Sequence, residues 1–215
     1  MCIIIYKPAG IAMPDQEILG NCFANHQDGA GFAHTDDLHV PYFEKGFFVL
    51  SQLIDRMNAR IKVGHRAMVH FRTGTGSPVS AGFCHPFPIT EDYRLMREML
   101  GGHSPELVFH NGIFGKSTKE YSDTMNFIAE ELSGYEFGQQ EADLLEDHMG
   151  WGALAVMTKA EDYLVGKWYH YKGCWFSNDS FRHGPKHPSY NSYFRQFSYD
   201  DYDGDEDKYW ELGDS

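Results

Sequence analysis

Cys2 is the residue of this sequence whose position gives it the clearest chemical potential. It follows Met1, and methionine aminopeptidases remove an initiator methionine when the next side chain is small. Removal leaves a thiol and a free α-amine on the same residue. An α-amine has an ordinary pKa of about 7.7–8.0, so near neutral pH it can take the thiol proton and activate the sulfur. Cys2 is therefore a candidate N-terminal nucleophile, although a Met-Cys start alone does not establish that role.

Three further segments place polar residues where apolar runs end. The first is NHQDGAGF at 25–32, a glycine-rich turn that enters an apolar run. The second is HFRTGTG at 70–76, followed by CHPF at 84–87. The third is FHNGI at 109–113, followed by SDT at 122–124. Each segment is short and unspecific alone, so their order and spacing behind Cys2 carry the argument.

In that order and spacing, these segments resemble the class II glutamine amidotransferases, a family of N-terminal-nucleophile (Ntn) hydrolases. The resemblance covers roughly residues 2–180 and is best to compact, stand-alone members. It implies an α+β fold, a four-layer αββα sandwich. It also implies hydrolysis of the γ-amide of glutamine through a Cys2 thioester, with release of ammonia and without a metal or organic cofactor. Such domains usually hand ammonia to a synthase, so a separate acceptor protein is expected.

The resemblance assigns the oxyanion hole to Asn111 and Gly112. Amide hydrolysis passes through a tetrahedral intermediate with a negative oxygen, which needs hydrogen-bond donors placed in advance. The side-chain amide of Asn111 and the backbone N–H of Gly112 would supply them. An Asn-Gly pair is also typical of a β-hairpin turn, and without the neighbouring segments that alternative would be preferred.

Glutamine carries a carboxylate and an ammonium group, so its site needs a cation and an anion. By the same resemblance, Arg72 binds the α-carboxylate with a bidentate fork, and Asp123 binds the α-ammonium. Thr75 would line the pocket and orient the substrate, and His85 would also touch it. The alternatives are a surface salt bridge for Arg72, a helix cap for Asp123 and a turn residue for His85.

The second segment departs from the family pattern. Thr73 and Gly74 stand where an aromatic or aliphatic residue and then alanine are usual, and Gly76 replaces a usual histidine or glutamine. These changes widen the wall around the substrate. Two alternatives therefore stay open: an Ntn amidohydrolase acting on another amide, such as a γ-glutamyl conjugate or a small peptide, and a catalytically silent binding or regulatory module of the same fold.

Composition restricts the other function classes. The net charge of −13 argues against nucleic acid or an anionic membrane as a partner. No apolar stretch approaches the roughly 20 residues that cross a bilayer, and the apolar start lacks a basic leader, so a cytoplasmic protein is expected. The cysteines at 22, 84 and 174 are far apart, which predicts free thiols and no metal site.

Patterning predicts strands flanking a helical middle. Strands are expected at 2–6, 30–33, 47–50, 67–71, 107–109, 153–157, 163–167 and 174–176. Helices are expected at 14–23, 51–59, 92–99, 122–132 and 140–148, with Ser122 and Asp123 at a helix start. One domain is expected over 1–198. The acidic segment 199–215 is expected to be disordered or loosely docked.

Overall fold

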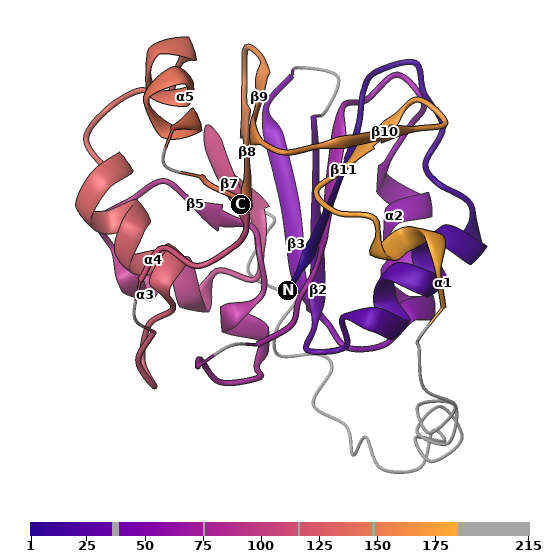
Figure 1. The fold of residues 1–215 in the computed structure, drawn as a ribbon, viewed down its shortest axis with the longest axis horizontal. Helices are drawn as coiled ribbons and strands as arrows, with labels where there is room; N and C mark the ends of the chain where they lie inside the picture. Colours follow the sequence, from indigo (N-terminus) through magenta and orange to yellow (C-terminus); the bar gives the residue numbers. More distant parts are fainter. Residues whose placement is uncertain (36–38, 75, 116, 148, 185–215) are drawn as a thin grey trace.

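The computed structural model describes residues 1–35, 39–74, 76–115, 117–147 and 149–184. These residues form two antiparallel sheets that pack face to face, with helices covering the outer face of each sheet (Figure 1). The predicted α+β class is confirmed. The order of layers is helix, sheet, sheet, helix.

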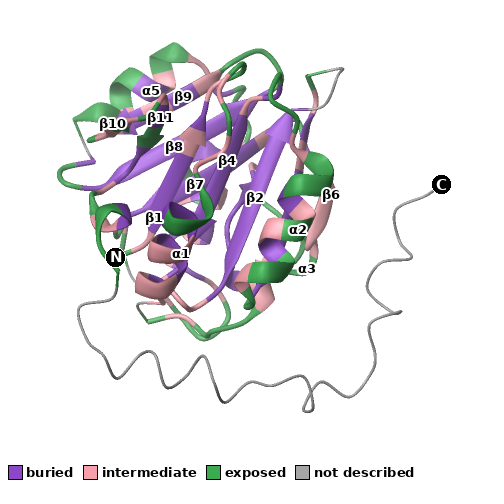
Figure 2. Ribbon diagram, turned by 90° about the vertical axis from the view of Figure 1, so that its right-hand side faces the viewer, coloured by how far each residue is buried: buried purple, intermediate pink, exposed green. Residues whose placement is uncertain are grey.

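The larger sheet carries the start of the chain in β1, an interior strand next to the central strand β4. Its strand order is β10-β11-β1-β4-β2-β3-β6. The strands span β1 (Ile3–Lys7), β2 (Ala30–Thr35), β3 (Pro41–Phe47), β4 (Ala67–Phe71), β6 (Gly101–His103), β10 (Tyr169–Tyr171) and β11 (Cys174–Phe176). Figure 2 shows the central strands of this sheet buried behind α1 and α2. The N-terminal strand is thus a core element.

The smaller sheet has the order β5-β7-β8-β9. Its strands are β5 (Phe87–Pro88), β7 (Glu106–Asn111), β8 (Ala153–Thr158) and β9 (Asp162–Gly166). Side chains alternate between the faces of a strand. Ile4 therefore points between the sheets against residues such as Phe109, while Ile3 and Ile5 point toward the outer helices.

Helices cover the outer faces and complete two further cores. The larger sheet packs on α1 (Gln16–Asn25) and α2 (Leu50–Arg60). The smaller packs on α3 (Tyr93–Glu98), α4 (Asp123–Phe127) and α5 (Gln139–Glu146). Three single turns, η1 (Ala81–Phe83), η2 (Ile128–Leu132) and η3 (Ser180–Arg182), connect these elements. No helix in the described part of the chain combines the length and apolarity needed to span a membrane.

One expected strand is wrong, and other strands were not expected. The strand expected at 47–50 does not form, because Phe47 ends β3 and Leu50 begins α2. Most of β3 was missed because it contains Glu44 and Lys45. Both side chains are buried, and each has a partner: Arg56 binds Glu44 at 2.7 Å, and Lys45 donates to the carbonyl of Met96 at 2.7 Å.

Other boundaries differ by a few residues. The helix expected at 122–132 is α4 continued by the wider turn η2, and β5, β6 and β10 were not expected. The acidic segment 199–215, and with it the expected domain boundary at 198, lies outside the described residues.

Candidate active site

Cys2 lies immediately before β1, beside the loop that follows β4. Ile3 pairs with Phe71 across these two strands, which brings Cys2 next to residues 72–74. The backbone N–H of Thr73 donates to the Cys2 sulfur at 3.3 Å, and the thiol donates to the Thr73 carbonyl at 3.5 Å. The sulfur is therefore held at one end of the sandwich, and Cys2 is only partly exposed.

The thiol of Cys2 has opposing influences on its acidity. Burial is the largest, and it raises the pKa of the Cys2 thiol above its ordinary value. The Thr73 N–H, the charge of the chain's amino terminus and the charge of Arg72 lower that pKa, while Asp123 raises it. At neutral pH the group is a thiol that needs a base, and both charged candidate residues lie within electrostatic reach of it.

Asn111 is brought to the start of β1 by a shared hydroxyl group. It is the last residue of β7, and its side-chain amide donates to Ser177 Oγ at 3.0 Å. The same oxygen accepts the backbone N–H of Ile4 at 2.8 Å. Ser177 thus joins the smaller sheet to the strand that begins one residue after Cys2.

Asn111 and Gly112 do not form a hairpin turn. The partner strand β8 begins only at Ala153, and the chain runs from β7 to α4. A Cβ atom on Gly112 would lie 2.7 Å from His110 Nε2, so no larger residue fits without movement. A pocket of about 190 Å³ borders Gly112. A backbone N–H beside such a space is suited to bind an oxygen.

Arg72 follows β4 and is buried, with 4% of its surface exposed. Its guanidinium donates to Ser77 Oγ at 2.7 Å, to the Ser77 carbonyl at 3.3 Å and to the Asp28 carbonyl at 3.3 Å. The carboxylate of Asp28 accepts the N–H of Gly74 at 2.7 Å. Arg72 and Asp28 therefore shape the loop that holds the sulfur, and the surface-salt-bridge alternative for Arg72 is wrong.

Asp123 is the first residue of α4, but Ser122 is the residue that caps this helix. Ser122 Oγ accepts the N–H of Met125 at 3.2 Å, whereas the Asp123 carboxylate accepts the N–H of Phe114 at 2.9 Å. The helix-cap alternative for Asp123 is therefore wrong. Its carboxylate fixes the loop that leads from Asn111.

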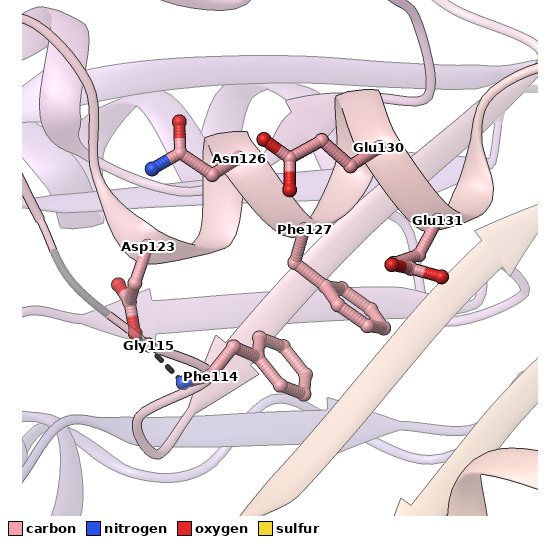
Figure 3. A pocket seen from close by; sticks show the side chains of 7 residues that line it. All are labelled: Phe114, Gly115, Asp123, Asn126, Phe127, Glu130 and Glu131. Carbon is pink, nitrogen blue, oxygen red and sulfur yellow. Dashed lines mark hydrogen bonds between the residues drawn. The ribbon is translucent and has the colours of Figure 1, made fainter.

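Asp123 also borders a pocket of about 230 Å³ (Figure 3). The figure shows two stacked phenyl rings on one side and polar side chains along α4 and η2 on the other. The lining residues are Phe114, Gly115, Asp123, Asn126, Phe127, Glu130 and Glu131. Cys2 and Arg72 do not line this pocket or the one at Gly112.

Thr75 and His85 are the two remaining residues predicted to bind the substrate. Thr75 lies outside the described residues. His85 lies between η1 and β5, 6% exposed, with its ring 4.2 Å from the ring of His70 and 4.7 Å from that of Phe87. Burial holds the pKa of His85 well below its ordinary value, so the ring is neutral. It packs beneath the site and lines neither pocket.

Residues around Cys2 that the sequence did not single out complete the site. Asn178 Nδ2 donates to the Cys2 carbonyl at 2.7 Å. His26 contacts Thr73 Oγ1 at 3.0 Å and Ser180 Oγ at 2.9 Å. The signal for Asn178 and Ser180 is the polar run SNDS directly after β11, whose neighbour in the sheet is β1. In the described part of the chain, no cluster of His, Cys, Asp or Glu is arranged to hold a metal.

Comparisons with known proteins find a likeness in structure and none in sequence. No model of a known protein family matches the sequence, and no curated protein matches it. The fold is similar to that of glutamine phosphoribosylpyrophosphate (PRPP) amidotransferase from B. subtilis, in its complex with ADP and GMP. The TM-score is 0.49 at 13% identity, over 82% of this chain and 41% of the other. This chain thus spans less than half of that protein, and a likeness at this level identifies neither family nor activity.

Proposed function

We propose that this chain is an Ntn amidohydrolase of the class II glutamine amidotransferase type, which hydrolyses the γ-amide of glutamine and releases ammonia. The observation that carries the proposal is the shared hydrogen bonding at Ser177, which ties the amide of Asn111 to the start of the strand behind Cys2. The cysteine that would be the nucleophile and the amide that would be the oxyanion donor thereby lie at the same end of the sandwich. The motifs around both residues point to the same reaction.

The reaction starts with removal of Met1. The α-amine of Cys2 takes the thiol proton, and the sulfur attacks the carbonyl carbon (Cδ) of the glutamine side-chain amide. The carbon–nitrogen bond breaks, the departing nitrogen takes the proton, and ammonia leaves a thioester on Cys2. A water molecule, deprotonated by the same amine, attacks the thioester. Glutamate leaves, and the proton returns to the sulfur.

Each predicted residue has a role in this scheme. Asn111 Nδ2 and the Gly112 N–H stabilise the oxyanion in both steps, and loss of one such donor typically lowers the rate about 10²–10³-fold. Arg72 binds the α-carboxylate and Asp123 the α-ammonium. Thr75 orients the substrate, and His85 supports the wall of the site. No metal or organic cofactor is required, and a separate synthase accepts the ammonia.

A second substrate class is favoured by one observation. The guanidinium of Arg72 is already bonded to Ser77 and to the Asp28 carbonyl. An amide substrate without an α-carboxylate, such as a small peptide, does not need the Arg72 guanidinium to bind a carboxylate in addition to these partners. Release of ammonia or amine from glutamine, γ-glutamyl conjugates and small peptides, measured side by side, separates the two classes.

The deciding experiment combines intact mass with active-site labelling. Mass spectrometry of the purified full chain is expected to show loss of Met1. A diazo-ketone analogue of glutamine is expected to modify Cys2, as mapped on the N-terminal peptide, and to abolish ammonia release. Cys2→Ala removes the labelling. Cys22→Ala, which deletes a thiol buried in α1, retains it.

Retention of Met1, or labelling confined to the other cysteines, contradicts the proposed function. If Cys2 is labelled but the protein does not hydrolyse glutamine, the remaining hypothesis is an Ntn amidohydrolase with another substrate. Native co-purification tests the acceptor, and a chain that purifies with no partner counts against a separate synthase.

A further inference from the structure

Asn178 has only one orientation that satisfies its neighbours. Its Nδ2 donates to the Cys2 carbonyl at 2.7 Å, and its Oδ1 accepts the N–H of Ser180 at 3.0 Å. Exchanging the two atoms would set oxygen against oxygen and N–H against N–H. Ser180 Oγ lies 2.6 Å from the same Oδ1. Since Oδ1 only accepts, the Ser180 hydroxyl must donate to it.

The hydrogen bond from Ser180 to Asn178 determines where the hydrogens of His26 and Thr73 lie. Ser180 Oγ has used its hydrogen, so toward His26 Nε2, 2.9 Å away, it can only accept. His26 therefore carries a hydrogen on Nε2. Burial lowers the pKa of His26 to about 4, so the ring is neutral at neutral pH and its Nδ1 is an acceptor. Thr73 Oγ1, 3.0 Å from Nδ1, must then donate to it.

The hydroxyl of Thr73 consequently presents a lone pair to the amino terminus. Its oxygen lies 3.1 Å from the carbonyl oxygen of Met1, close enough to donate to it. The hydroxyl has a single hydrogen, however, and the contacts of Ser180 with Asn178 and His26 assign that hydrogen to His26. The Met1 carbonyl carbon is bonded to the Cys2 nitrogen. Removal of Met1 takes this carbonyl away and turns that nitrogen, which is two bonds from the lost oxygen, into an amine with N–H donors beside the position the oxygen leaves.

We propose that Thr73 is the positioning residue for the catalytic base: its Oγ1 accepts a hydrogen bond from the α-amine of Cys2 once Met1 is removed. His26 holds the hydroxyl hydrogen away from the amine. When one N–H of the amine points to Thr73 Oγ1, the amine lone pair is free to face the Cys2 sulfur. The backbone N–H of Thr73 donates to that sulfur. The inference rests on the proposed function, and it explains a threonine at a position where the resembled family has an aromatic or aliphatic residue.

The first test measures the amine without catalysis. Cys2→Ser chains, in which the N-terminal residue itself carries no thiol to compete for reagent, are acetylated with acetic anhydride across pH, and the N-terminal peptide is quantified by mass spectrometry. Thr73→Val removes the acceptor of the ammonium form, so the amine pKa falls and acetylation below that pKa becomes faster. Thr73→Ser retains the hydroxyl and is expected to match the parent. Thr158→Val, which deletes a hydroxyl bonded to the Glu161 carbonyl, is the matched control.

The second test uses the reacting enzyme with Cys2 intact. In Thr73→Val, the acidic limb of the kcat/KM profile for glutamine moves to lower pH and the plateau falls, while KM changes less than kcat. An amine pKa that is equal in the valine variant and the parent overturns the inference, as does a serine variant that shifts as far as valine. Retention of Met1 also overturns it. A wild type that hydrolyses no glutamine, with the amine shift present, refutes the proposed function and leaves this inference standing.

Discussion

Asn111 and Ile4 donate to one oxygen atom, Ser177 Oγ, at 3.0 and 2.8 Å. The first residue ends a strand of the smaller sheet, and the second belongs to β1, an interior strand of the larger one. Beside this link, the His70 ring contacts the His110 carbonyl at 3.0 Å, again across the two sheets. The candidate site therefore depends on how the two sheets are held together at this end.

Ser177→Ala is expected to weaken both the fold and the reaction. It leaves the buried N–H of Ile4 unpaired, which costs about 1–3 kcal/mol of unfolding free energy, and it frees the Asn111 amide to rotate. Urea denaturation and glutamine kinetics measure the two effects. Ser104→Ala removes another buried hydroxyl, which donates to the Glu106 carbonyl, and should lower stability with unchanged kcat. Equal loss of kcat in both variants would refute the special role of Ser177.

Asn111→Ala is expected to reduce kcat for glutamine roughly 10²–10³-fold, because one oxyanion donor is lost. KM should change much less, since the ground-state carbonyl needs this donor less than the transition state does. Steady-state kinetics over a range of glutamine concentrations provide the measurement. Asn58→Ala, on the exposed side of α2, is the control and should behave as wild type. A variant of Asn111 altered only in KM would place this residue in binding.

Arg72→Gln and Asp123→Asn are expected to shift the acidity of Cys2 in opposite directions. The charge of Arg72 lowers the thiol pKa, so its removal raises that pKa; Asp123 acts in the opposite sense. At a fixed pH below the thiol pKa, alkylation of Cys2 by iodoacetamide should be slower in the first variant and faster in the second. Peptide mapping isolates Cys2 from the other thiols. Asp55→Asn on the exposed face of α2 should have no effect, and shifts of the same sign in both test variants would contradict the proposed arrangement.

Acid is expected to destabilise the protein below about pH 6.5, the ordinary pKa of histidine. Burial lowers the pKa of His70 and of His110 to about 3, that of His26 to about 4, and that of His85 well below the ordinary value. Between those values and pH 6.5, the unfolded chain binds protons that the folded chain does not. As the pH is lowered through this range, the unfolding free energy therefore decreases, by up to about 1.4 kcal/mol per pH unit for each histidine.

Asp162 works in the opposite direction, because burial raises its pKa to about 6 and the folded state binds its proton first. Urea titrations between pH 7.5 and 5 measure the net slope. His85→Phe removes one titrating ring whose nitrogens have no hydrogen-bond partner in the described structure, so its slope should be shallower by up to one proton. An unchanged slope would show that His85 does not titrate on unfolding.

The strands nearest the site could be predicted because their sequences are locally unambiguous. β1 begins with three isoleucines and is followed by Pro8, and β4 and β11 are short apolar runs. The polar residues that follow such runs were identified because a strand end is where a side chain can leave the core. Local sequence therefore predicted these strands, although most of β3 and all of β5, β6 and β10 were missed.

What sequence could not supply were partners distant in the chain. Glu44 and Lys45 fit inside a sheet only because Arg56 and the Met96 carbonyl lie beside them in the folded state. Likewise, a serine after a strand is unremarkable until Ile4, 173 residues away, donates to it. The roles proposed for Ser177, Thr73 and Asn178 rest on such tertiary neighbours.

The position of β1 between β4 and β11 also sets an order of events in synthesis. The first strand cannot gain its second neighbour until residues 174–176 have been synthesised. The loop that contacts the Cys2 sulfur, at Thr73, is made about a hundred residues earlier than Ser177 and Asn178. The contacts around Cys2 are therefore completed only after β11 has joined β1.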